Sequence, residues 1–167
     1  HLWIAFNAAY ARDIKGDERE RFRSFFEALV PLDTERRLYD AVWERFSGPV
    51  RLLIDSPHVY APFWEHHNSG GAQAQDWKAR FERARAAFRR AFAAGDTAAV
   101  LCMLFDRLYV LRNQLVHGGA TWGSRVNRGQ LRDGAQILAR LVPVILDVMM
   151  DNPEAAWGAP YFPVVGD

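Results

Sequence analysis

The chain has 167 residues, of which 50% are hydrophobic and 25% are charged, and its formal net charge at pH 7 is +1. This balance is typical of a globular domain with a single hydrophobic core, and it excludes a disordered or collagen-like chain. A net charge so close to zero argues neither for nor against a nucleic acid as partner. We therefore expect one domain spanning residues 1–167.

Apolar residues recur every three or four positions through the first part of the chain, which predicts amphipathic helices. Three such helices are expected, over residues 2–14, 17–30 and 34–46. Helix-breaking residues mark the ends of the second and third: Pro31, and then Gly48 with Pro49.

The middle of the chain, residues 49–75, is the least regular part of the pattern. The stretch "VRLLI" at 50–54 could form a short strand or a helical turn. Residues that favour turns mark loops in this segment: Pro57, Pro62 and "NSGG" at 68–71. We therefore expect an irregular segment between two helical regions.

The second half of the chain carries the strongest helical signal. A helix is predicted over residues 76–94, and "GDT" at 95–97 breaks the pattern, with Asp96 placed as an N-cap. A long apolar stripe that starts at Thr97 predicts the next helix, and Gly118 fits the position just after its end.

A last helix is expected over about 129–150, where Pro143 should kink or interrupt it. The tail, residues 152–167, is predicted to be extended and packed on the body. Two long helices joined by a short loop form an antiparallel pair. We therefore predict an all-α helical bundle of four to six helices, with an irregular middle segment and an extended C-terminal tail.

Cysteine usage and hydropathy bear on the compartment in which the protein works. The one cysteine, Cys102, lies in an apolar helical run, where a thiol acts as a small buried hydrophobe. It cannot form an internal disulfide, and a reducing environment fits. No apolar run reaches the ~20 residues that span a bilayer, and we expect no signal peptide. We expect a cytoplasmic protein without membrane contact.

The stretch "RNQLVHGG" at 112–119 sets three polar side chains into the end of the long predicted helix. His117 would feel the negative end of the helix dipole, which favours its imidazolium form. Arg112 supplies a permanent charge with a fork that fits phosphate oxygens, and Asn113 lies four residues before His117. Together they could bind a phosphodiester and move a proton without a metal. A capping histidine beside a surface arginine would produce the same pattern without any function.

"RNQLVHGG" resembles the R-N-x-x-x-H signature of the HEPN superfamily, and it stands at the end of a long helix, as in that family. The opening "LWIAFNAAYA" and the trailing "HGGATW" resemble patterns seen in a subset of prokaryotic HEPN-like proteins. The resemblance is sharp over about 20 residues, and elsewhere it extends only to the order of the helices.

The resemblance implies a four- or five-helix domain that forms a homodimer, with two motif helices meeting across a cleft. Many members are metal-independent endoribonucleases of toxin–antitoxin, abortive-infection or CRISPR systems, and others are binding or dimerisation modules. Carried over, His117 would assist proton transfer with the RNA 2′-hydroxyl or the leaving oxygen. Arg112 would stabilise charge on the scissile phosphate, and Asn113 would orient His117 or the phosphate. The product would be a 2′,3′-cyclic phosphate.

The implied partners are RNA, a second copy of the chain, and a cognate antitoxin or another domain of a longer chain; no cofactor is implied. The chain begins at His1 rather than methionine, which is typical of a processed chain or a domain of a longer protein. Three functions stay open: a HEPN-type ribonuclease in toxin or phage-defence settings, a non-catalytic module that binds RNA, a nucleotide or a protein, and a purely structural helical domain.

Further residues could support such a site. Asn7 is polar in an otherwise apolar helix, where it could brace the motif helix or serve a structural contact, and Tyr10 could do either. Residues after the motif could contact RNA: Arg125, Arg128 and Arg132 through phosphates, and Trp122 by stacking on a base. A second basic set lies on the helix over 76–94, where Glu82 offsets part of its positive charge: Arg80, Arg83, Arg85, Arg89 and Arg90.

Three histidines lie close together in the irregular middle: His58, and His66 with His67 in "WEHHN". Histidine binds zinc, and Glu65 could join them, but adjacent side chains on a helix point apart. We expect a solvated loop here and no metal site.

Overall fold

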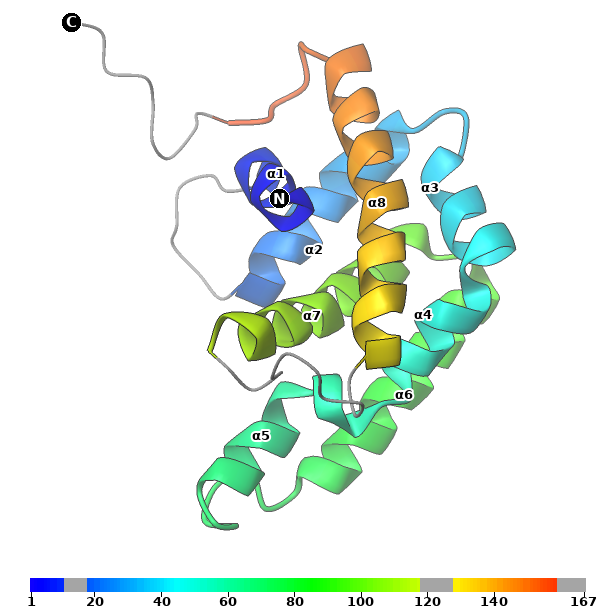
Figure 1. The fold of residues 1–167 in the computed structure, drawn as a ribbon. Coiled ribbons are helices and arrows are strands. Elements are labelled where there is room, and N and C mark those ends of the chain that lie inside the picture. Colours follow the sequence, from blue (N-terminus) through cyan, green and yellow to red (C-terminus); the bar gives the residue numbers. More distant parts are fainter. Residues whose placement is uncertain (11–17, 118–127, 159–167) are drawn as a thin grey trace, which may run out of the picture.

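The computed structural model describes residues 1–10, 18–117 and 128–158, and Figure 1 shows that their regular structure is helical. The α-helices are α1 (Leu2–Tyr10), α2 (Glu18–Leu29), α3 (Arg37–Asp40), α4 (Ser47–Ile54), α5 (Ala61–Asn68), α6 (Trp77–Ala94), α7 (Thr97–Val116) and α8 (Arg128–Asp151). No strand occurs in these ranges, so the prediction of an all-α bundle is confirmed. The eight α-helices of these ranges exceed the four to six predicted, because the middle segment forms helices where loops were expected.

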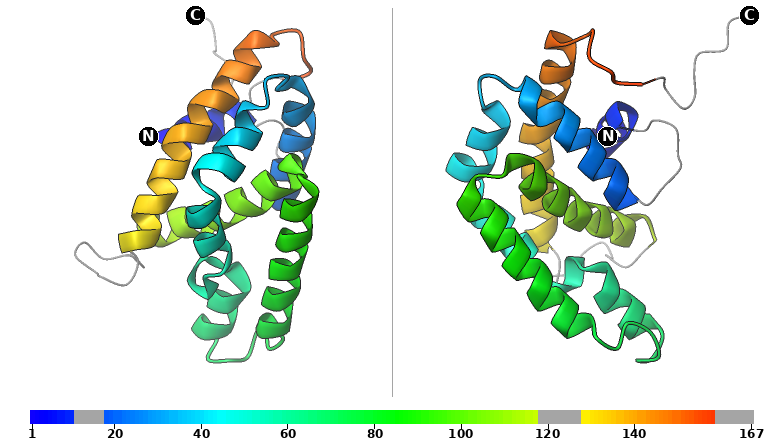
Figure 2. Two further views of the ribbon diagram at one scale, coloured as in Figure 1. Left: turned by 90° about the vertical axis from the view of Figure 1, so that its right-hand side faces the viewer. Right: turned by 180° about the vertical axis from the view of Figure 1, so that it is seen from behind.

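The longest apolar stripe of the sequence becomes the central helix of the bundle. Helix α7 packs against α2, α4, α6 and α8, while α8 also packs against α1. Figures 1 and 2 show α8 crossing α7 instead of lying alongside it, so the expected antiparallel pair of these two helices is wrong. Helix α7 contacts α2 and α6 more extensively than α8, so its main neighbours come from other parts of the chain.

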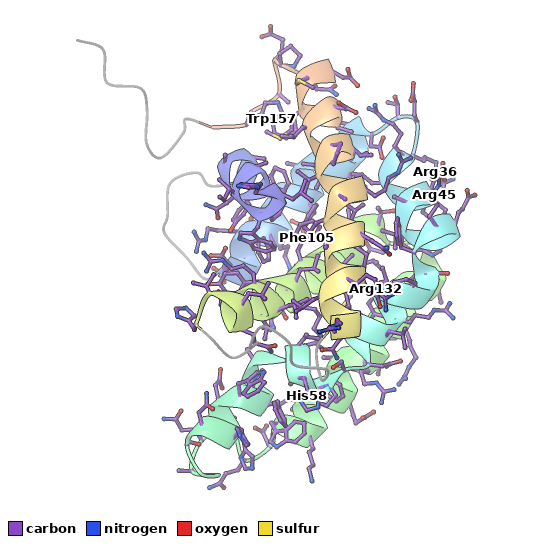
Figure 3. All side chains as sticks on the ribbon, in the orientation of Figure 1. Arg36, Arg45, His58, Phe105, Arg132 and Trp157 are labelled. Atoms are coloured by element: carbon purple, nitrogen blue, oxygen red, sulfur yellow. The ribbon has the colours of Figure 1, made fainter. Side chains whose placement is uncertain are left out.

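The core is built around aromatic side chains that α1, α2 and α7 contribute. Phe105 of α7 is fully buried (Figure 3), with its ring centroid 4.2 Å from that of Phe6 and 5.0 Å from that of Phe26. Trp3 packs over the same cluster, 6.3 Å from Phe105. Offset and edge-on contacts of this kind stabilise a core beyond the area that they bury.

The crossing of α7 and α8 depends on a glycine. A Cβ atom on Gly134 would lie 3.0 Å from Cδ2 of Leu111 and 3.2 Å from Cδ2 of Leu108, closer than ordinary packing allows. The two backbones therefore approach at a point where no larger side chain fits without movement.

We expect Gly134→Leu to lower the free energy of unfolding by about 1–3 kcal/mol, because the added side chain must push α8 away from α7. Gly129→Ala is the matched control in the first turn of the same helix. It has nothing within 4 Å of its Cβ position, and it should leave stability unchanged or slightly raised. Urea unfolding followed by circular dichroism measures both. Equal midpoints for the two variants would contradict a close crossing.

The middle segment is more helical than predicted. Helix α4 contains "VRLLI" and begins before it, at Ser47, so these residues form a helix and not a strand. Pro49 lies in its first turn, and Pro62 lies in the first turn of α5. Proline is tolerated there because the first backbone N–H groups of a helix have no partner within it. The prolines that predicted loops therefore begin helices, Pro57 included, which opens a short 3₁₀ turn, Pro57–Val59.

The helix expected over residues 34–46 is interrupted. Arg36 has a left-handed backbone with φ of 56°, α3 begins only after it, and a π-helical turn, Ala41–Arg45, follows α3. A left-handed residue cannot belong to a right-handed helix, so the helical pattern begins later than its apolar spacing suggests.

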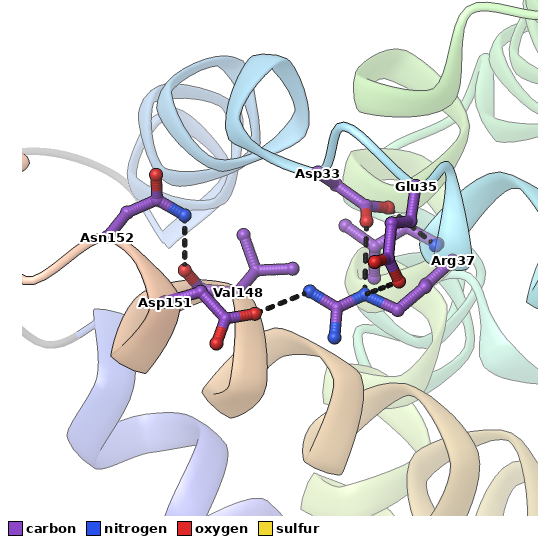
Figure 4. Close-up of polar contacts among 7 residues, drawn as sticks. Asp33, Glu35, Arg37, Val148, Asp151 and Asn152 are labelled. Atoms are coloured by element: carbon purple, nitrogen blue, oxygen red, sulfur yellow. Dashed lines mark hydrogen bonds and ion pairs between the residues drawn. The ribbon is translucent and has the colours of Figure 1, made fainter.

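A buried carboxylate holds the start of α3, and the neighbouring Arg37 links α3 to the end of α8 (Figure 4). Asp33 accepts a hydrogen bond from the backbone N–H of Leu38 at 2.7 Å, and its other oxygen lies 3.4 Å from Nε of Arg37. Nη2 of Arg37 also donates to Asp151 at 2.9 Å. The guanidinium therefore bridges two elements that are distant in sequence.

The second half of the chain follows its predicted boundaries closely. Asp96 accepts from the backbone N–H of Ala99 at 3.0 Å, which confirms it as the N-cap of α7. Helix α8 continues unbroken through the exposed Pro143, so the alternative of a local break is wrong. In the described part of the tail, Trp157 packs against the core. Gly118 and residues 159–167 lie outside the described residues.

None of the helices in the described ranges combines the length and the apolar character that a bilayer crossing requires.

Candidate functional site

The motif residues occupy the end of α7, where the helix emerges from the core. His117 directly follows the last helical residue, and its backbone N–H donates to the carbonyl of Asn113 at 2.9 Å. Its side chain is exposed and makes no hydrogen bond within the described part of the chain. Asn113 and Arg112 are each half-buried, and Nη1 of Arg112 donates to Oδ1 of Asn113 at 3.0 Å.

An open cleft of about 970 Å³ lies between the end of α7 and helix α5. Helix α7 contributes residues spaced three or four apart, which therefore share one face: Asp106, Tyr109, Asn113 and His117. The backbone carbonyl of His58, labelled in Figure 3, accepts hydrogen bonds from Trp64 of α5 at 2.8 Å and from Gln114 of α7. These bonds hold the two walls of the cleft at a fixed separation.

Arg112 does not line this cleft. It faces a smaller hollow of about 370 Å³ together with residues of α1 and α8, among them Leu2 and Leu131. Arg112 and His117 are about 140° apart around a regular helix, and in this structure they face different hollows. The hydrogen bond to Asn113 is what connects the arginine to the cleft.

Two large apolar side chains are exposed between the motif residues. Leu115 is 50% exposed and Val116 is 58% exposed, in the same turn that presents Arg112 and His117. Apolar side chains of this size at a helix end are typical of a surface that contacts another protein.

The charges of the cleft nearly balance. Among the described residues that line it, carboxylates come from Glu18, Glu65 and Asp106, and arginines are Arg19 and Arg80. Asp106 pairs with Arg19 at 2.7 Å. The cleft of one chain therefore offers no large positive potential that would attract a polyanion.

The two supporting residues of α1 connect to the cleft through α2. Tyr10 is buried, and its hydroxyl bonds Oδ1 of Asn7 at 2.9 Å and also the carboxylate of Glu18. Burial, and then the hydrogen bond to Glu18, raises the pKa of Tyr10. Asn7 itself is exposed. Neither residue hydrogen-bonds the motif side chains in the described ranges: Tyr10 bonds Glu18 of α2, and Asn7 bonds Tyr10.

Of the described arginines that could contact RNA, Arg80 lines the cleft, whereas those near the start of α8 do not. Arg128 and Arg132 are exposed near the start of α8 and do not line the cleft; Arg132 is labelled in Figure 3. Arg125 and Trp122 lie outside the described residues. On α6, three of the five arginines are engaged by carboxylates, as the ion pairs Arg80–Asp76, Arg83–Asp76 and Arg85–Asp55 show.

The three histidines of the middle segment are held by aromatic and backbone contacts. Nδ1 of His66 bonds the carbonyl of Gln73 at 3.1 Å, and His67 stacks on Phe63. Within the described ranges, no group of three histidine, cysteine or acidic residues is arranged to bind a metal. This segment is mostly helical, in α5, where a loop was predicted.

Sequence reasoning missed three residues of α7 that shape this region: Asp106, Arg107 and Tyr109. Asp106 and Tyr109 continue the face of Asn113 and His117 at helical spacing, so the periodicity could have found them. Arg107 lies three residues after Leu104 and four before Leu111, within the apolar stripe, and it is only 3% exposed. Cys102 of the same helix is buried, as expected, and burial raises its pKa.

The chain matches no protein-family model, no curated protein and no solved structure. Its function must therefore be inferred from the residues and from the geometry of α7.

Proposed function

We propose that the protein is a HEPN-type, metal-independent endoribonuclease that acts as a homodimer. The observation that carries this proposal is the side-by-side placement of Asn113 and His117 on an open cleft, with Arg112 hydrogen-bonded to Asn113. An exposed imidazole at a helix end can exchange protons with a substrate, which an imidazole locked in internal hydrogen bonds could not do. An RNA substrate and an unpaired cysteine both fit a cytoplasmic location.

The reaction would be an internal transfer at phosphorus. The RNA 2′-oxygen forms a bond to phosphorus as its proton leaves, the bond from phosphorus to the 5′-oxygen breaks, and that oxygen takes up a proton. His117 would accept the first proton or deliver the second. Arg112 would stabilise the charge on the phosphate oxygens, and Asn113 would orient Arg112 by the bond that already joins them. The products are a 2′,3′-cyclic phosphate and a 5′-hydroxyl.

A dimer would bring Arg112 of one protomer close to His117 of its partner, two side chains that face different hollows in a single chain. Arg112 and His117 face different hollows, and the exposed Leu115 and Val116 lie between them. If these apolar side chains pack against their copies about a two-fold axis, the arginine of one protomer can meet the histidine of its partner. A second arginine would also add the positive charge that the cleft of one chain lacks.

Mixing two inactive variants tests this arrangement. Arg112→Ala and His117→Ala are each expected to be inactive on RNA in EDTA. When they are refolded together, mixed dimers should contain one intact site and restore about a quarter of the parent activity. Recovery of cyclic-phosphate ends measures the result. If the parent cleaves and the mixture does not, each site lies within one protomer and the dimer proposal fails, while the ribonuclease proposal stands.

A non-catalytic module that binds RNA, a nucleotide or a protein is the second candidate. It is favoured by the near balance of charge in the cleft and by the position of Arg112 outside it. Absence of cleavage by the purified parent would select this function. If the protein is a ribonuclease, we propose that it acts as a toxin or defence component, with a cognate antitoxin or a neighbouring domain as partner.

A further inference from the structure

Arg107 is a buried cation that forms no hydrogen bond or ion pair with the residues that the structure describes. Only 3% of the residue is exposed, and its Nε and Nη1 atoms are buried without a hydrogen bond in the described part of the chain. The guanidinium carbon lies 4.4 Å from the ring centroid of Tyr60 and 5.7 Å from that of Phe81. These aromatic faces stabilise the charge, but they satisfy none of its N–H donors.

A cavity of about 600 Å³ lies beside this cation, lined by residues of α2, α6 and α7. Small side chains make the α6 wall apolar, namely Ala84, Ala87 and Ala91, while α2 contributes charged residues. Its volume is in the range of sites that take small organic molecules.

The acidic residues around this cavity are at its rim or already engaged. Asp106 pairs with Arg19 at 2.7 Å, while Glu27 and Asp96 are exposed. None of them forms an ion pair with Arg107. Burial lowers the pKa of Arg107 to about 10, which still leaves the guanidinium a cation at neutral pH.

We propose that this cavity binds a small organic anion with an apolar body, whose carboxylate or equivalent group pairs with Arg107. Two N–H donors in a planar fork fit a carboxylate, and the alanine-lined walls fit a flat ring system or a short alkyl chain. A buried guanidinium is out of reach of a nucleic-acid backbone, so the ligand is a small molecule.

The proposal does not depend on ribonuclease activity. None of the three motif residues lines this cavity, although Arg19 and Asp106 line both it and the cleft. The two sites can therefore be tested separately.

Calorimetric titration of the full chain tests the site with 2-naphthoate, with 2-naphthylmethylamine, which has the same rings and the opposite charge, and with sulfate. We expect 2-naphthoate to bind one to one, about tenfold or more tightly than the amine or sulfate, because only it supplies both an anion and an apolar body. The side-chain Nε–Hε NMR signal of Arg107 should shift on binding.

Variants decide whether the binding is at this site. Arg107→Met should weaken 2-naphthoate about tenfold or more, whereas Arg140→Met, at an exposed arginine of α8, should not change it. Ala87→Leu keeps the cation and fills the cavity, so it should also weaken binding, and it decides the matter if Arg107→Met does not fold. No binding by the parent, or equal binding by the parent and Ala87→Leu, would overturn the proposal and leave Arg107 as a partner of Tyr60 only.

Discussion

Replacing His117 with alanine is expected to reduce RNA cleavage in EDTA by about 10²–10⁴-fold, the range over which a positioned acid or base contributes to catalysis. The side chain is exposed and has no hydrogen bond within the described ranges. The substitution should therefore leave the thermal unfolding temperature nearly unchanged, and the loss would belong to chemistry and not to folding. A defined RNA, labelled at its 5′-end and resolved by electrophoresis, measures the rate and identifies the cyclic-phosphate end.

His67→Ala is the matched control, because His67 is also exposed but does not line the cleft. It should cleave at the parent rate. Cleavage that survives in His117→Ala would remove His117 from the mechanism. Equal activity in all preparations, including Arg112→Ala, would identify a contaminating nuclease.

Phe105→Ala is expected to have the largest effect on stability, lowering the free energy of unfolding by about 3–5 kcal/mol. The ring is fully buried at the centre of the aromatic cluster, and α1 and α2 both pack on it. Its removal leaves a cavity that rigid aromatic neighbours cannot fill by small movements. Because each kcal/mol lowers the unfolding temperature of a chain of this length by about 2–4 °C, calorimetry resolves the change.

Leu52→Ala is the control for this prediction. Leu52 is 66% exposed, so this substitution should lower the free energy of unfolding only slightly. Equal losses in the two variants would contradict the assignment of Phe105 to the core. Because Phe105 and the motif lie on one helix, we also expect Phe105→Ala to lose RNA cleavage near its lowered unfolding temperature and to retain it well below.

The composition and the apolar spacing were sufficient to predict an all-α protein and the extents of α6, α7 and α8. Long helices with strong periodicity carry their signal locally, since each residue's face is set by its position along the helix. Asp96 could be placed as an N-cap for the same reason, because a cap bonds a backbone N–H only three residues away.

The middle segment could not be predicted in this way, because proline is common both after the end of a helix and in the first turn of a helix. A proline can end a helix that precedes it or begin one that follows. Pro49 and Pro62 begin α4 and α5, which pack against α7 and α6 respectively. The left-handed Arg36 has no signal in the sequence, since arginine seldom adopts this conformation.

The sequence predicted Arg112, Asn113 and His117 at the end of one long helix, and the structure has all three at the end of α7. What only the tertiary structure decided is which way each one faces. Arg112 turns towards α1 and α8, while Asn113 and His117 turn towards α5. Spacing along one helix determines relative directions, but the neighbours that cover each direction come from distant parts of the chain. The burial of Arg107 also depends on the tertiary structure, because Tyr60 and Phe81, which pack on it, belong to other elements.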